Sequence, residues 1–276
     1  MGRDHGDVQL LIEMSHTFAN EERYLLQPTK TVALNMKHSK RISAAVQNIN
    51  FKPGEQNLNS ADSSIHLGIT RTTSVCETAE VNIEGNISNA RRALYSLFEA
   101  GLHGHNGLDH KSMLDIYKCF VLPVLTYGIE IFIPKSTLIN QHELFQRKTI
   151  KQLLSLPNKI ADLCVFILTK LLPIKAIYHL KILNFFNNIC GQSETSTERQ
   201  ILLRQLSVKS GNSASWINCV RPLPAKYELG EADEYLEKPL NKSQWRSKIH
   251  KNCSQLLETI YWQNILHLYL PKIHEH

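Results

Sequence analysis

The stretch ISNARRALYSLFEAGLHGHNGLDHKSMLDIYKCFVLPVLTYGIEIF, residues 87–132, decides the fold. Apolar side chains in its first part recur at the spacing of one helix face, and Gly101 stands where a left-handed residue ends a helix. Turn-forming residues fill GLHGHNGLD, 101–109, and Asp109 is placed as the N-cap of a second helix. Pro123 falls inside this second pattern, so we expect that helix to kink or split. The stretch therefore predicts two helices joined by a turn.

Further helical patterns follow, and proline separates them. Pro157 and Pro173 leave short connections, of the kind that place successive helices side by side in a bundle. GQSETS, 191–196, has the composition of a linker, and Thr197 with Gln200 has the spacing of a capping box before the next helix. We therefore expect helices at about 136–156, 160–171 and 174–190, another from 197, and a last one from about Ser243 to Leu268.

The N-terminal part of the chain predicts a mixture of helix and strand. Residues 8–22 have apolar side chains at helical spacing and predict an amphipathic helix. TVALNM, 31–36, and SIHLGIT, 64–70, predict two short strands, with Gly68 marking a bulge or a close backbone approach. The polar residues 37–63 between them predict a loop or a weak hairpin. The expected fold class is α+β with helices dominating.

Composition sets loose limits on function. The chain has 276 residues, of which 42% are hydrophobic, so it can bury a substantial core. Its formal charge of +6 allows nucleic-acid binding without demanding it. No signal peptide and no membrane span are expected from the hydropathy pattern. The cysteines form no Cys-x-x-Cys pair, which favours reduced thiols in an intracellular protein; they stand at positions 76, 119, 164, 190, 219 and 253.

The opening stretch resembles the thumb-side region of reverse transcriptases from non-LTR (LINE-like) retrotransposons. That family has an ARR-LY-L helix, a GLHG-NGL turn and a long helix that ends in VLP-LTYG-E. Further segments resemble the family in the same order along the chain: VQLLIEMSHTFANEERYLLQPTKTVAL, IHLGI, SLPNKIADLCVFILTKLLPIKAIYHLKILNFFNNI, SWINCVRPL and PLNKSQWRSKI. The resemblance implies a palm remnant with a small sheet of a few strands and one helix at 1–79, a thumb-like helical bundle at 80–191, and a C-terminal helical extension at 192–276.

The same resemblance argues against polymerase activity in this chain. Nucleotidyl transfer in the family needs two divalent ions, held by an Asp pair on a hairpin and by a further Asp on a neighbouring strand. The sequence begins just beyond the place where that pair would lie, and Asp4 and Asp7 have no flanking apolar strand. We interpret both as surface charges that lead a helix. No catalytic residue and no cofactor are therefore expected, and Mg²⁺ would belong only to a complete family member.

Three histidines crowd the predicted turn. His103, His105 and His110 leave two interpretations open: an extended His-x-His metal pair, or solvated turn histidines. No cysteine or carboxylate completes a ligand set at short range, which favours the second interpretation. Only His103 fits the family pattern.

Nucleic-acid contact is the functional inference that remains. A polymerase thumb grips template and primer through their backbones, which suits basic side chains on helix edges. For each such residue alone, a solvated surface position is the competing interpretation. Tyr95, Tyr117 and Tyr127 lie on apolar stripes, which favours core positions over base stacking. The candidates for backbone contact are Arg91, Arg92, Lys111, Lys118, Arg147, Lys148 and Lys151, and the last three have the spacing of one helix edge.

Three hypotheses follow for the chain as a whole. The first is a catalytically inert C-terminal part of a retrotransposon reverse transcriptase. The second is a domesticated module that binds the backbone of RNA or of an RNA:DNA hybrid. The third is a helical scaffold for protein partners. Open edges of the small sheet would favour self-association of the N-terminal part in any of these cases.

Overall fold

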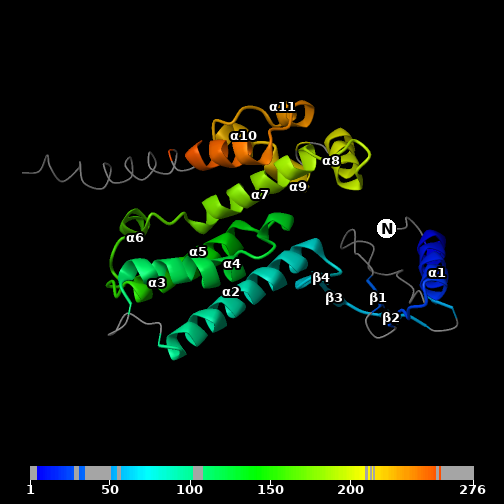
Figure 1. The fold of residues 1–276 in the computed structure, drawn as a ribbon, viewed down its shortest axis with the longest axis horizontal. Coiled ribbons are helices and arrows are strands. Elements are labelled where there is room, and N and C mark those ends of the chain that lie inside the picture. Colours follow the sequence, from blue (N-terminus) through cyan, green and yellow to red (C-terminus); the bar gives the residue numbers. More distant parts are fainter. Residues whose placement is uncertain are drawn as a thin grey trace, which may run out of the picture. The chain divides into compact units, whose positions relative to one another are not determined.

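The computed structural model describes residues 5–27, 31–34, 51–54, 57–101, 108–208, 211, 213, 215–252 and 255. Within them the protein is predominantly helical, with two small two-stranded sheets, which confirms the α+β class (Figure 1). The chain forms two compact units, residues 1–82 and 83–276, and each is described by itself.

The first unit opens with helix α1 (His5–Glu21), close to the predicted bounds. Strand β1 (Val32–Ala33) pairs in parallel with β2 (Asn59–Ser60). The predicted strand 31–36 is therefore only two residues long within its described part, and its last two residues lie outside the described residues. Most of the predicted loop 37–63 also lies outside them.

The segment predicted as one strand over 64–70 is a hairpin. Strands β3 (Ser63–His66) and β4 (Ile69–Thr72) pair antiparallel, with His66 opposite Ile69. Leu67 and Gly68 form the two-residue turn, with φ angles of 50° and 75°. A tight hairpin turn of type I′ needs positive φ at both central residues. The prediction of a bulge at Gly68 was wrong, because Gly68 is the second residue of this turn. The sequence does not show the turn, since leucine rarely takes a positive φ and the usual Asn-Gly signature is missing.

Asn82 anchors the hairpin to the first turns of helix α2 (Val75–Glu99). Its Nδ2 donates to the carbonyl oxygen of Thr70 at 2.6 Å, and its Oδ1 accepts from the Thr70 N–H at 2.9 Å. The hydroxyl of Thr78 accepts from the Thr72 N–H at 2.9 Å. The β4 backbone thus finds partners on a helix instead of on a third strand.

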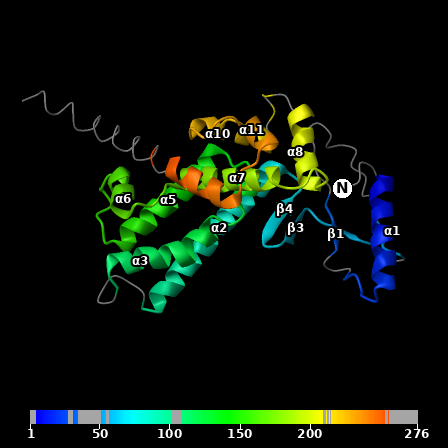
Figure 2. The ribbon, with the colours of Figure 1, turned by 45° about the horizontal axis from the view of Figure 1, so that its top comes forward.

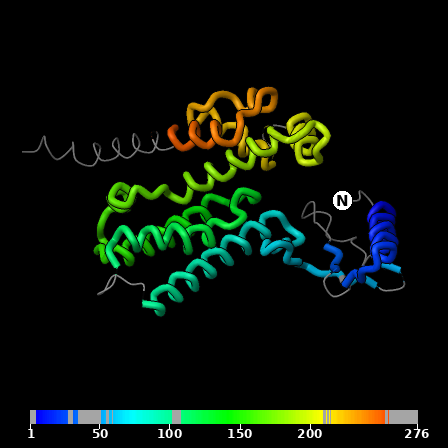
Figure 3. The backbone as a smooth tube through the Cα atoms, in the orientation of Figure 1, coloured from blue at the N-terminus to red at the C-terminus, as the bar shows by residue number. Residues whose placement is uncertain are grey.

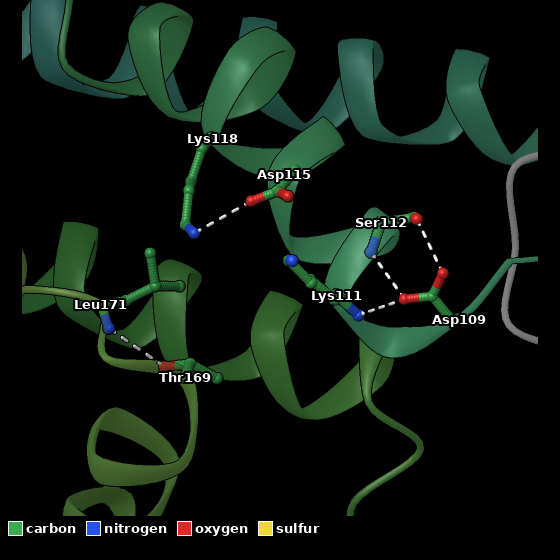
Figure 4. A network of polar contacts seen from close by, with 7 residues as sticks. All are labelled: Asp109, Lys111, Ser112, Asp115, Lys118, Thr169 and Leu171. Atoms are coloured by element: carbon green, nitrogen blue, oxygen red, sulfur yellow. Dashed lines mark hydrogen bonds and ion pairs between the residues drawn. The ribbon is translucent and has the colours of Figure 1, made fainter.

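The decisive stretch forms the two predicted helices. Helix α2 ends before Gly101, whose φ of 85° confirms the left-handed stop. Asp109 confirms the predicted cap of α3 (His110–Ile116), because its Oδ1 accepts from the N–H groups of Lys111 and Ser112 at 2.8 and 2.9 Å (Figure 4). These hydrogen bonds, first those from Ser112, hold the pKa of Asp109 below its ordinary value.

The second helix does not split at Pro123, because residues 110–125 are all helical; it changes type just before the proline instead. Proline has no N–H to offer the carbonyl four residues earlier, and its ring crowds that carbonyl. The chain passes from α3 into a π-helical turn, η2 (Tyr117–Val121), and then into the short helix α4 (Leu122–Leu125). Gly128, with a φ of 64°, turns the chain into the 3₁₀ helix η3 (Ile129–Ile131).

Helix α7 (Ile174–Cys190) is the centre of the second unit. Residues on nearly all of its sides are buried, including Ile174, Leu183 and Phe186. It packs on α5 (Ser136–Leu153) and η3 on one side and on later helices on the other, as Figures 1, 2 and 3 show from two directions. Further helices of this unit are α6 (Asp162–Thr169), α8 (Thr197–Val208), α9 (Trp216–Val220), α10 (Leu223–Lys226) and α11 (Ala232–Glu237).

The described residues after the predicted linker share the core of α7. Buried Leu202, Tyr235 and Trp245 belong to the same hydrophobic cluster as the α7 side chains. The predicted capping box at Thr197 is wrong by one residue, because the hydroxyl of Ser196 accepts from the Arg199 N–H at 3.2 Å. The last helix is described over residues 242–252 and at 255, and the rest of its predicted length lies outside the described residues.

Candidate nucleic-acid interface

Three of the predicted basic residues line one open cleft. Arg147, Lys148 and Lys151 of α5 all contribute to its lining: Lys148 is exposed, Arg147 is partly buried and Lys151 is buried. The cleft has a volume of about 890 Å³. The loop between α5 and α6 closes one side of it. The full lining consists of Leu144, Arg147, Lys148, Lys151, Gln152, Ser155, Leu156, Asn158 and Asp162.

Asp162 neutralises part of this basic cluster. Its Oδ2 lies 2.7 Å from Nη1 of Arg147, and its Oδ1 lies 2.9 Å from Nζ of Lys151. The carboxylate is 43% exposed and is the first residue of α6. A single acidic side chain thus holds two of the three cations through both of its oxygens.

Lys151 is committed to the fold of the adjoining loop. Its side chain is only 10% exposed. Besides the ion pair, Nζ donates to the carbonyl oxygens of Asn158 and Ile160 at 3.2 and 2.8 Å. The ammonium group therefore uses its three N–H donors within the protein. This arrangement gives Lys151 a supporting role in the cleft wall.

Arg147 and Lys148 are more accessible. Arg147 is 28% exposed on its side chain. Lys148 is exposed, and none of the described residues pairs with its ammonium group. These two side chains are the ones that could meet an anion entering from solvent.

Arg91 on helix α2 contacts a side chain of helix α5. The guanidinium carbon of Arg91 lies 6.0 Å from the centre of the Phe145 ring on α5, at the outer limit of a cation–π contact. Phe145 is three residues before Lys148, so the two side chains are neighbours on the helix surface. Arg91 thereby extends the basic surface of α5 beyond the cleft.

The other predicted residues lie outside the cleft. Arg92 bonds to Asn89 on its own helix. Nζ of Lys118 pairs with Oδ1 of Asp115 at 3.1 Å, on a surface where both side chains are about half exposed (Figure 4). Lys111 is exposed in the first turn of α3. The seven candidates therefore do not form one continuous contact row.

The tyrosines divide between core and surface. Tyr117 is 1% exposed, which confirms its predicted core position, and burial raises its pKa well above the ordinary value. Tyr95 and Tyr127 are 50% and 49% exposed, so their predicted core positions were wrong. Tyr95 follows buried Leu94, and a step of one residue turns a helical side chain by about 100° away from the core face.

A metal site is not found in the described part of the chain. Within it, no three His, Cys, Asp or Glu side chains are grouped as ligands. His103, His105 and Asp4 lie outside the described residues, while His110 and Asp7 are exposed at the N-terminal ends of helices.

The hydropathy of the described helices gives one further result. No single one of them is long and apolar enough to cross a membrane, although α6 and α7 together pass that test across a bend of 55°.

Comparison of the chain with protein-family models, with curated proteins and with solved structures finds no match.

Sequence reasoning missed the two residues that organise this surface. Asp162 is 15 residues from Arg147, and only the turn between α5 and α6 brings them together. The sequence does not mark Phe145, because one aromatic residue on a helical stripe does not indicate a contact with a particular arginine such as Arg91. The one usable signal was the acidic residue at the start of the apolar run DLCVFIL.

Proposed function

We propose that the second unit, residues 83–276, binds the phosphate backbone of RNA or of an RNA:DNA hybrid through the basic cleft on α5. The observation that carries the proposal is that Arg147, Lys148 and Lys151 line one cleft whose lining holds a single half-exposed carboxylate, that of Asp162. The cleft retains a net positive charge, and Arg147 presents a planar donor group that suits phosphate oxygens. The resemblance to the thumb region of non-LTR reverse transcriptases supports the same proposal.

The three basic residues take different parts in this proposal. Arg147 and Lys148 contact phosphate, because their side chains are accessible. Lys151 positions the loop at 158–160 and so keeps the cleft open.

We further propose that the chain binds without catalysing nucleotide transfer. A primer-template extension assay with Mg²⁺ and deoxynucleotides should then show no product, and extension that is lost in Asp7→Asn would contradict this part.

Binding should be salt-dependent and should depend on the cleft. The full chain is expected to bind a labelled RNA:DNA hybrid of about 20 base pairs in fluorescence anisotropy at low salt, with affinity that falls steeply as salt rises. The double variant Arg147→Ala/Lys148→Ala should weaken binding by about tenfold and reduce the salt slope by about 1 to 2, because two phosphate contacts are lost.

A charge-matched control separates the cleft from general basicity. Arg204 and Lys242 are exposed and lie outside the cleft lining, so Arg204→Ala/Lys242→Ala removes the same charge elsewhere. It should change affinity less than threefold, since it leaves the cleft contacts in place. Equal losses in the two double variants would show that the cleft is not the binding surface.

The first unit favours a second function, association with protein. Helix α1 has an apolar outer stripe at positions i, i+3 and i+7: Leu11, Met14 and Phe18 are 46%, 60% and 54% exposed. The inner side of α1 carries buried Ala19 and partly buried Ile12. We propose that this exposed stripe is the interaction surface.

Self-association through α1 is the expected result in the absence of a partner. Sedimentation velocity of the full chain should show a concentration-dependent oligomer. The variant Leu11→Ser/Phe18→Ser should shift it toward monomer, because it makes the stripe polar. Glu13→Gln/Asn20→Ser alters exposed α1 positions on the side away from that stripe and serves as the control. A monodisperse wild-type monomer at tens of micromolar, an order-of-magnitude concentration, would exclude this function.

A further inference from the structure

We propose that Asp162 is an internal competitor of nucleic-acid phosphate, so that the cleft binds a backbone phosphate only when the Asp162 carboxylate leaves Arg147. This inference rests on the proposed function and deepens it by naming how the site is regulated. It concerns the region where α5 and α6 face each other in the second unit.

The geometry of the ion pairs places the carboxylate where a phosphate would lie. Both carboxylate oxygens are used, one on Nη1 of Arg147 at 2.7 Å and one on Nζ of Lys151 at 2.9 Å. Phosphate offers the same kind of charged oxygen acceptor and prefers the same donors. Asp162 and a phosphate group therefore compete for Nη1 of Arg147 and Nζ of Lys151.

The pair is built so that it can be displaced. Asp162 is 43% exposed and Arg147 is 28% exposed, and ion pairs in contact with water contribute little to stability. Arg147 gives only Nη1 to Asp162, and its Nε is buried with no hydrogen-bond partner among the described residues. A phosphate that takes two donors of the guanidinium would use it more fully. Lys151 keeps its two carbonyl partners when the carboxylate leaves.

Removal of the carboxylate charge should therefore strengthen binding. In the full chain, Asp162→Asn is expected to raise affinity for the RNA:DNA hybrid by about threefold to tenfold at constant salt. The matched control is Asp233→Asn. Asp233 is also about half exposed and pairs with an arginine, Arg221, at 2.8 Å, outside the cleft lining. Asp233→Asn makes the same change in net charge as Asp162→Asn and should alter affinity for the hybrid less than twofold.

A double-mutant cycle tests the route of the effect. In the Arg147→Ala background, Asp162→Asn should give no gain beyond that of Asp233→Asn, because the cation for which carboxylate and phosphate compete is absent. Equal effects of the two asparagine variants in the wild-type background, or weaker binding by Asp162→Asn, would overturn the proposal. Failure of every variant and of the wild type to bind would instead reject the proposed function itself.

A measurement on the wild-type chain covers the case in which Asp162→Asn does not fold. Displacement of the carboxylate removes the contacts that join the start of α6 to α5. Addition of the hybrid should then speed amide hydrogen exchange in α6 at residues 164–169, whose N–H groups have acceptors within the helix. Unchanged or slower exchange there in the bound state would show that Asp162 stays in place and would also overturn the proposal.

Discussion

Replacing Trp245 with alanine is expected to lower the free energy of unfolding by about 3–5 kcal/mol, the usual cost of emptying a buried tryptophan site. Trp245 is 1% exposed, and its ring lies 4.8 Å from that of Tyr235, edge to face. Both side chains belong to the cluster centred on α7. The loss should therefore appear as a lower denaturant midpoint for the second unit as a whole, followed by far-ultraviolet circular dichroism.

The matched control removes a large apolar side chain from the surface. Leu203 on α8 is 45% exposed, so Leu203→Ala should change the free energy of unfolding by no more than about 0.5 kcal/mol. A loss of less than about 1 kcal/mol for Trp245→Ala would contradict the common core. A separate early transition in that variant would indicate that the residues after 191 fold as a distinct unit.

The helices of this protein could be predicted because their signals are local. Asp109 and Gly101 each act on the backbone within one helical turn, and each has the predicted effect. Pro123 also acts locally, but it follows a π-helical turn in an unbroken helix and does not split it. The hairpin at Leu67 and Gly68 could not be predicted in the same way, because its turn conformation is imposed by the surroundings. Asn82, on the following helix, holds the hairpin's second strand through side-chain hydrogen bonds that leave no sequence pattern.

The candidate site depends even more on tertiary contacts that leave no pattern in the sequence. The spacing of Arg147, Lys148 and Lys151 predicted one helix edge, and the three residues line one cleft. Spacing could not show that Lys151 is almost fully enclosed and bonded to a loop, or that Asp162 pairs with two of the cations. Ion pairs between helices depend on the packing angle and on the connecting loop. Those features are set by the core, not by the residues that form the pair.

Two buried histidines should make the second unit sensitive to acid. His142 is fully enclosed on α5, and burial lowers its pKa to about 4, an effect that the nearby backbone of Ile83 opposes. His179 on α7 is 9% exposed and lies 2.6 Å through Nδ1 from the Tyr227 hydroxyl. Burial, with the charges of Lys226 and Lys175, lowers the pKa of His179 to about 4 as well.

The direction of the pH effect follows from these lowered pKa values. The unfolded chain takes up a proton at each histidine near the ordinary pKa of 6.5, whereas the folded chain does so only near 4. The stability from the two neutral histidines is complete above pH 6.5 and is lost as pH falls toward 4. Between pH 7 and pH 5 each histidine should lower the free energy of unfolding by about 2 kcal/mol.

Urea unfolding at several pH values measures this loss, and leucine variants assign it. His142→Leu should roughly halve the decrease between pH 7 and pH 5, and His142→Leu/His179→Leu should nearly abolish it, because leucine cannot bind a proton. The readout is the pH dependence within each variant. Any packing cost of leucine lowers the free energy of unfolding by the same amount at every pH, so it does not change the pH dependence. A decrease of wild-type size in the double variant would show that other groups carry the acid sensitivity, and it would contradict the neutral, buried state of both rings.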